Sequence, residues 1–224
     1  MKRLADIRRA GQALLRDRRA LAMTEFALAM PFFLTAGLGG IEVASYSLQV
    51  MRVNQIASQI ADNASRIGDY STLDNRKIYE GDINDLLTGA DLAAGTQMSL
   101  FTKGRVIISS LEYQTSGSNT QYIHWQRCMG TKRVASSYGV QGTTFAIGMG
   151  PSGREVYASK GEAVMFVEVK YDYQPLVGSS VIGTPTISSI ASFTVRSSRD
   201  LSQVYQRTPA DPVMTCDKYT GTLS

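Results

Sequence analysis

The sequence predicts an α+β protein in which one long N-terminal helix packs across a small antiparallel sheet. Two observations carry this prediction. An apolar stretch long enough to cross a bilayer runs directly into a segment with helical spacing, and four later segments are rich in β-branched and aromatic residues. We therefore divide the chain into a basic leader (1–20), a long helix (21–67) and an α+β domain (68–224).

The leader carries the positive charge of the chain. It holds seven basic residues against two acidic ones, so the rest of the chain is nearly neutral although the whole has a net charge of +4. A nucleic-acid-binding domain usually carries its basic residues on the folded body, with aromatic residues among them. The distribution therefore argues against nucleic acid as a partner.

The long helix is predicted to begin in a membrane. The basic residues stop at Arg19, and from Leu21 to Ser45 the only charged residues are Glu25 and Glu42. This stretch is long enough to cross a bilayer as a helix. By the positive-inside rule, the leader stays in the cytoplasm and everything after about residue 45 is exported. We expect a single-pass inner-membrane protein with a periplasmic C-terminal domain.

Helical periodicity continues beyond the apolar stretch. Apolar residues recur at alternating steps of four and three, at Tyr46, Val50, Val53, Ala57, Ile60, Ala64 and Ile67, which predicts an amphipathic helix that reaches the domain. Two alternatives stay open, a cleaved secretory signal and the buried core helix of a cytosolic protein. The first lacks a cleavage site followed by a break in the helical pattern, and the second does not explain the charge asymmetry.

Glu25 is the unusual residue of the apolar stretch, because an ionised carboxylate in the apolar part of a membrane helix is costly. One interpretation places Glu25 near the cytoplasmic interface, where it reaches water beside Arg18 and Arg19. The other pairs it with a positive charge on a neighbouring protein. The position of Glu25 in the sequence does not decide between them.

Several motifs follow one another around this segment, namely Arg18-Arg19-Ala20, Thr24-Glu25-Phe26-Ala27, Pro31-Phe32-Phe33 and Gly40-Ile41-Glu42. In this order they resemble the TadE-like family, which comprises pseudopilins of the tight-adherence (Flp, type IVc) pilus system. The resemblance covers about residues 18–66. Two later patches, residues 125–128 and 167–176, resemble segments in the exported part of these proteins.

The resemblance implies a pilin-like fold and a role in pilus assembly, with other pilin or pseudopilin subunits and the assembly platform as partners. In related pseudopilins a prepilin peptidase removes the leader. Here the cut would fall between Ala20 and Leu21, and the Glu25 carboxylate would pair with the new Leu21 amine of an adjacent subunit. Because Ala20 stands where the family usually has Gly, the alternative is an uncleaved, membrane-anchored periplasmic sensor or binding module.

The exported domain is predicted to open with a turn at residues 68–71 and one or two short helices within 75–94, whose helical spacing uses Ile78, Ile83, Leu86, Leu87 and Leu92. Strands are expected at 105–113, 121–128, 163–173 and 188–196. The loop at 115–119 predicts a hairpin between the first two strands.

The two cysteines, Cys128 and Cys216, lie too far apart for a CxxC metal or redox motif. The choice is therefore between two free thiols and one long-range disulfide. Export into an oxidising compartment favours the disulfide. It would clamp the C-terminal tail, which follows Pro209 and Pro212, onto the end of a strand.

The sequence gives little support for catalysis. Residues 148–153 match G-x-G-x-x-G, but Pro151 interrupts the motif and no helix is predicted after it, so we expect a surface loop. His124 is the only histidine, and no cluster of metal ligands or nucleophile-elbow motif accompanies it. We predict no enzyme and no cofactor; an anchored envelope enzyme is a further alternative.

Overall fold

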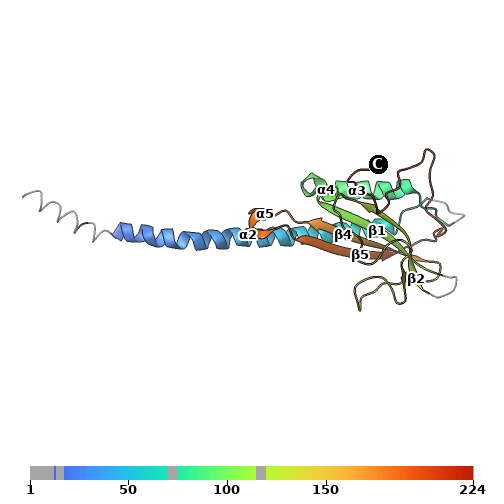
Figure 1. Cartoon of the computed structure of the whole chain (residues 1–224), viewed down its shortest axis with the longest axis horizontal. Coiled ribbons are helices and arrows are strands. Elements are labelled where there is room, and N and C mark those ends of the chain that lie inside the picture. Colours follow the sequence, from blue (N-terminus) through green and yellow to red (C-terminus); the bar gives the residue numbers. More distant parts are fainter. Residues whose placement is uncertain (1–12, 14–17, 70–74, 115–119, 224) are drawn as a thin grey trace, which may run out of the picture.

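The computed structural model describes residues 13, 18–69, 75–114 and 120–223, so most of the leader, the end of the predicted turn and the 115–119 loop lie outside the described residues. Its longest element is the helix α2 (Arg18–Ala64), which extends far beyond the domain (Figure 1). The other elements are α3 (Glu80–Met98), α4 (Leu100–Lys103), β1 (Gly104–Tyr113), β2 (Gln121–Met129), β3 (Thr144–Phe145), β4 (Ala163–Asp172), α5 (Ser179–Ile182) and β5 (Thr186–Thr194).

The five strands form one antiparallel sheet in the order β3-β2-β1-β4-β5. The central strand β1 pairs with β2 on one side and β4 on the other, so that Ile108 lies opposite both Arg127 and Val167. Each of the four predicted strands is present, and the bounds differ from the prediction by one or two residues. The α+β class is therefore confirmed, with a long N-terminal helix and an antiparallel sheet.

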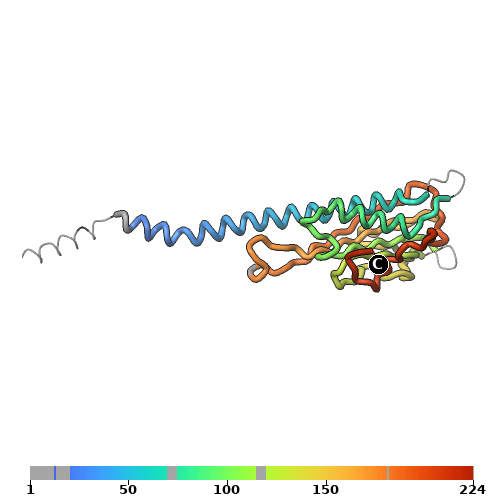
Figure 2. Tube along the Cα trace, turned by 90° about the horizontal axis from the view of Figure 1, so that it is seen from above, coloured from blue at the N-terminus to red at the C-terminus, as the bar shows by residue number. Residues whose placement is uncertain are grey.

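The two long helices cover one face of the sheet (Figure 2). α2 packs on β4, β5 and α3 through the apolar seam that its spacing predicts, with Val53, Ala57, Ile60 and Ala64 fully or almost fully buried. α3 adds Ile83 and Leu87 to this core, whereas Leu92 is 78% exposed because it lies on the opposite side of α3 from Leu87. Leu92 lies within α3, as the helical spacing predicts, but it does not contribute to the core.

The second face of the sheet is also covered, which the sequence did not predict. Alternate residues of β1, β2 and β4 form a smaller core there with the 138–158 segment, made of Leu111, Ile123, Met149, Ala158, Val164 and Phe166. Met149 lies inside the predicted surface loop, yet it is fully buried and pairs with Val156. The G-x-G-x-x-G segment is therefore a loop, but one that helps to close this face.

Candidate membrane and assembly interface

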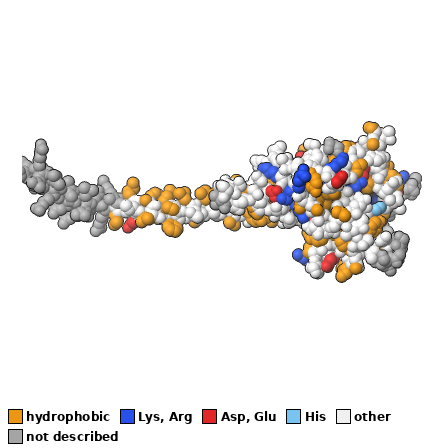
Figure 3. All heavy atoms as spheres, viewed as in Figure 1, with side chains coloured by type: hydrophobic (Ala, Val, Ile, Leu, Met, Phe, Trp, Pro, Cys, Tyr) orange, Lys and Arg blue, Asp and Glu red, His pale blue; other side chains and the backbone are white. Residues whose placement is uncertain are grey.

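The N-terminal half of α2 is an exposed apolar rod. Figure 3 shows hydrophobic side chains along it, with an acidic side chain near its beginning. The most apolar 18-residue window of the span Leu21–Ala64 has a mean hydropathy of 1.6 and is almost entirely exposed. The chain therefore has a helix that is long and apolar enough to span a membrane.

The exposure of α2 changes along its length, from exposure on all sides to burial of one face. Large apolar side chains such as Phe32 and Phe33 are more than 70% exposed, whereas Val53 and Ala57 are inaccessible to solvent. No break in the helix separates the two halves, even though Pro31 lies inside it. One continuous helix thus forms the exposed rod and also contributes to the core of the domain, so the rod and the domain are joined without a break.

The residues of the predicted processing and assembly site lie in the first turns of α2. The Ala20 backbone is helical, and Leu21 and Glu25 are both exposed. Residues four positions apart lie on the same face of a helix. The hydroxyl of Thr24 donates a hydrogen bond to the Leu21 carbonyl at 2.8 Å. Leu21 and Glu25 therefore share one exposed helical face.

Glu42 marks the end of the apolar rod and binds the domain directly. The residue is only 5% exposed, and its Oε2 accepts hydrogen bonds from the backbone N–H groups of Leu176 (2.9 Å) and Val177 (3.0 Å). Nearby, the ring of Tyr46 meets that of Tyr173 edge to face, with centroids 5.1 Å apart. Glu42 belongs to the motif recognised in the sequence, but its backbone partners lie too far along the chain to be predicted.

A groove lies between α2 and the 174–185 loop at this point. It has a volume of about 380 Å³ and is lined by Gly39, Glu42, Val43, Tyr46, Tyr173, Ile182 and Pro185. Figures 1 and 2 both show the loop, which contains α5, leaving the sheet and running beside α2 toward its N-terminal half. The domain therefore contacts the rod through this loop at the level of Glu42.

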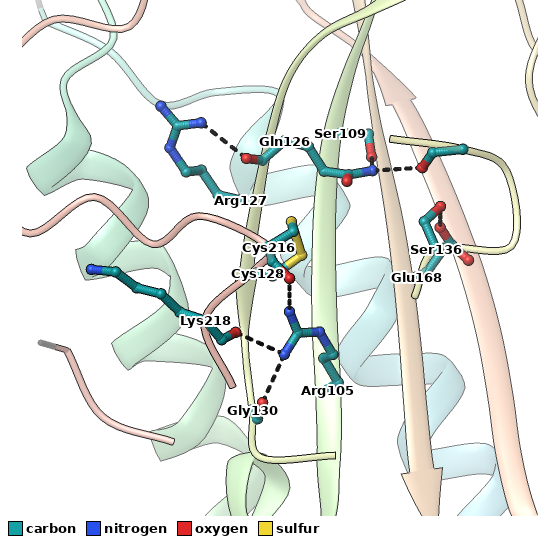
Figure 4. Close-up of a disulfide and its surroundings, with 11 residues drawn as sticks. Arg105, Ser109, Gln126, Arg127, Cys128, Gly130, Ser136, Glu168, Cys216 and Lys218 are labelled. Carbon is teal, nitrogen blue, oxygen red and sulfur yellow. Dashed lines mark hydrogen bonds between the residues drawn. A yellow bond between two sulfur atoms is a disulfide. The ribbon is translucent and has the colours of Figure 1, made fainter. Parts of the chain in front are cut away.

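The predicted disulfide between Cys128 and Cys216 is present (Figure 4). It fastens the C-terminal tail to β2, on the face of the sheet opposite the helices.

Arg105 of β1 strengthens the attachment, because its guanidinium donates hydrogen bonds to the carbonyl groups of Gly130, Cys216 and Lys218. Burial lowers the pKa of Arg105 from its ordinary value. Sequence reasoning missed Arg105, because a basic residue at a strand end usually indicates a surface position.

A polar cluster lies at the other end of β1 and β2. The pairing of Ser110 with Trp125 and of Leu111 with Ile123 leaves His124 as an extra residue in β2, at a β-bulge. His124 Nδ1 lies 2.8 Å from Glu112 Oε2, and the Ser110 hydroxyl donates to Glu112 Oε1 at 2.7 Å. The hydrogen bond with Glu112 raises the pKa of His124.

This cluster does not have the arrangement of a hydrolytic triad. In such a triad the histidine contacts the serine and takes its proton, whereas here both Ser110 and His124 bind the carboxylate of Glu112. Within the described part of the chain, no three His, Cys, Asp or Glu residues are grouped so that they could hold a metal ion.

Comparison with known proteins gives no relative for this chain. No family model matches it, and no curated protein or solved structure does.

Proposed function

We propose that this chain is a pseudopilin-like subunit that spans the inner membrane once and takes part in assembling a pilus of the tight-adherence type. The leader would be cytoplasmic and the domain periplasmic. The observation that carries the proposal is the two-part character of α2, whose first half is an exposed apolar rod and whose second half buries one face in the domain core. The motifs around α2 follow one another in an order that resembles the TadE-like family, and this resemblance is the reason for proposing a role in pilus assembly.

The rod has the features needed for lateral contact between helices in a membrane. Apolar side chains surround it, and an added Cβ at Gly37, Gly39 or Gly40 would meet no neighbouring atom within the chain. Small residues let two membrane helices approach closely. A neighbouring subunit could therefore pack against this part of α2 without displacing anything in the domain.

Glu25 supports the assembly role through its chemistry. A carboxylate in a low-dielectric environment is tolerated when a cation meets it, and removing one partner of such a pair is strongly unfavourable. If the chain is cut between Ala20 and Leu21, the new amine lies within one helical turn of Glu25 in its own chain. In an assembled row of subunits, that amine would neutralise the Glu25 of the adjacent subunit.

The N-terminus of the protein isolated from its membrane tests the proposal. Mass spectrometry should find a chain that begins at Leu21. Ala20→Gly should be processed at least as well, because it restores the family's usual residue, and Ala20→Val serves as the matched variant that should block the cut. A chain that keeps Met1 in cells producing the pilus would instead support the alternative, a membrane-anchored periplasmic sensor or binding module.

A further inference from the structure

The 174–185 loop has an unusual composition for an exposed segment. From Tyr173 to Val195 the chain contains no Asp, Glu, Lys, Arg or His. Three of its large apolar side chains lie at the surface, since Leu176 is 66%, Ile182 44% and Val177 38% exposed. Single exposed apolar residues are ordinary, but an uncharged loop that presents several of them indicates a contact surface.

The loop is held at a defined level along the rod. The hydrogen bonds from Leu176 and Val177 to Glu42 fix it beside the end of the apolar stretch. Residues 21–41 form a helix of about 30 Å, which matches the thickness of a bilayer core. If the leader marks the cytoplasmic boundary of that core, Glu42 and the loop lie at its outer boundary.

The residues around the loop match a membrane interface. Tyr46 packs edge to face on the buried Tyr173 at this level and is itself 37% exposed, and tyrosine is enriched where a membrane meets water. The groove beside them is lined mainly by apolar side chains. At the base of the loop, Lys132 binds Asp172 at 2.5 Å, so charged groups begin where the sheet begins.

We propose that the 174–185 loop inserts its apolar side chains, led by Leu176, into the outer leaflet of the bilayer that α2 spans. The inference rests on the proposed membrane-spanning role of α2 and adds a second lipid contact to it. With two contacts on one rigid unit, the domain would be held upright on the membrane rather than swinging on a single helix. The lipid acyl region is the partner, because the loop offers no charge to a headgroup or to a charged protein surface.

Quenching by brominated lipids tests the loop directly. The full chain is reconstituted into vesicles of phosphatidylcholine and phosphatidylglycerol, one set with lipid brominated at a shallow acyl position and a second set with lipid brominated near the ends of the acyl chains, which reaches a probe in the middle of the bilayer. A tryptophan is introduced by Leu176→Trp, and Ile147→Trp serves as the matched control because Ile147 is 71% exposed in a loop near β3. The native Trp125 is 95% buried and provides the constant background. We expect the lipid brominated at the shallow position to lower the emission of the tryptophan introduced by Leu176→Trp about twofold, because its ring would lie at the depth of the acyl chains. The emission of the tryptophan introduced by Ile147→Trp should not change.

A third variant separates failure of the loop inference from failure of the proposed function. Phe32→Trp places the probe in the middle of the apolar rod, where the native side chain is 78% exposed. If Phe32→Trp is quenched and Leu176→Trp is quenched no more than Ile147→Trp, the rod spans the membrane but the loop does not enter it. A different result would be that the emission maximum of Leu176→Trp moves to shorter wavelength as the protein-to-lipid ratio rises, without quenching by bromine. That result would show that the loop contacts a neighbouring copy, and it would also overturn the inference. If Phe32→Trp itself is not quenched, the proposed function and the inference fail together.

Discussion

Glu42 accepts a hydrogen bond from the backbone N–H of Leu176, a residue 134 positions later in the chain. The bond joins the helix α2, at the point where its apolar rod ends, to the loop that leaves the sheet beside it. A second bond from the Val177 N–H reaches the same carboxylate oxygen. Glu42 thus fixes the 174–185 loop against α2 at the point where the apolar rod ends.

Replacing Glu42 should therefore release the loop. Glu42→Leu removes both hydrogen bonds to a charged acceptor, each worth about 1.5–3 kcal/mol. We expect the Leu176 and Val177 amides to exchange their hydrogens at least about tenfold faster in the reconstituted full chain, because a tenfold change corresponds to about 1.4 kcal/mol. The Ser202 amide, which binds the Asp200 side chain at 2.9 Å, is the internal reference and should not change. Unchanged exchange at Leu176 would contradict the role given to Glu42.

The disulfide should contribute a large part of the stability of the domain. It joins residues with a sequence separation of 88. In the chain-entropy model, closing a loop of this size stabilises a protein by about 4.6 kcal/mol. Cys128→Ser combined with Cys216→Ser should lower the free energy of unfolding by about this amount, measured in urea through the fluorescence of the buried Trp125. A midpoint equal to that of the native chain would show that the tail is held by other contacts.

Arg105 is one of several further contacts that hold the tail, and it binds the carbonyl of Cys216 itself, so its effect should depend on the disulfide. Arg105→Leu removes three hydrogen bonds to main-chain carbonyls, two of them in the tail, and should cost about 2 kcal/mol in the native background. Without the disulfide the tail detaches more easily, and the same substitution should cost less. Groups that act on one element typically show coupling of about 0.5–3 kcal/mol.

The matched control for this cycle is Arg196→Leu. Arg196 makes an ion pair with Asp62 at 3.4 Å, and both side chains are substantially exposed. Exposed pairs contribute about 0.2–1 kcal/mol, so this substitution should have a small effect that is the same with and without the disulfide. Equal costs of Arg105→Leu in the two backgrounds would mean that Arg105 and the disulfide act on separate elements.

Much of the fold could be predicted because the relevant signals are local. The apolar seam of α2 and the β-branched runs of β1 and β4 depend on spacing within one segment, and these elements lie where the sequence placed them. The two-residue strand β3 and the cover of the second face could not be predicted in this way. They consist of irregular segments whose burial depends on the sheet already being formed.

The candidate interface was predictable only in part, for a related reason. The apolar rod could be recognised from the composition of its segment, and the disulfide from the presence of two cysteines. The role of Glu42 could not, because its partners are backbone N–H groups that any residue could supply. Arg105 was missed because its partners are likewise main-chain carbonyls, in a tail without regular structure. Polar contacts to the main chain leave no pattern in the sequence of the segment that provides them.

The pair formed by His124 and Glu112 should make stability depend on pH. The hydrogen bond with Glu112 raises the pKa of His124 above its ordinary value of 6.5 in the folded state. Below pH 6.5 the imidazole is protonated in both the folded and unfolded chains, and the full stabilisation by Glu112 is present. As the pH rises through the folded-state pKa, His124 loses its proton and this stabilisation is lost.

His124→Gln should therefore lower the free energy of unfolding more at about pH 6 than at about pH 8. Arg199 is also close enough to Glu112 to feel its charge, but burial lowers its pKa only to about 10, so it stays charged over this range. Glu112→Gln provides the control, because in its background only burial, which lowers the pKa of His124, remains, so the cost of His124→Gln should no longer be larger at about pH 6 than at about pH 8. Trp125 lies next to His124 in β2 and reports unfolding of this region. A native-minus-variant difference that stays constant, or grows as the pH rises, would mean that the protonated imidazole does not stabilise the fold through Glu112.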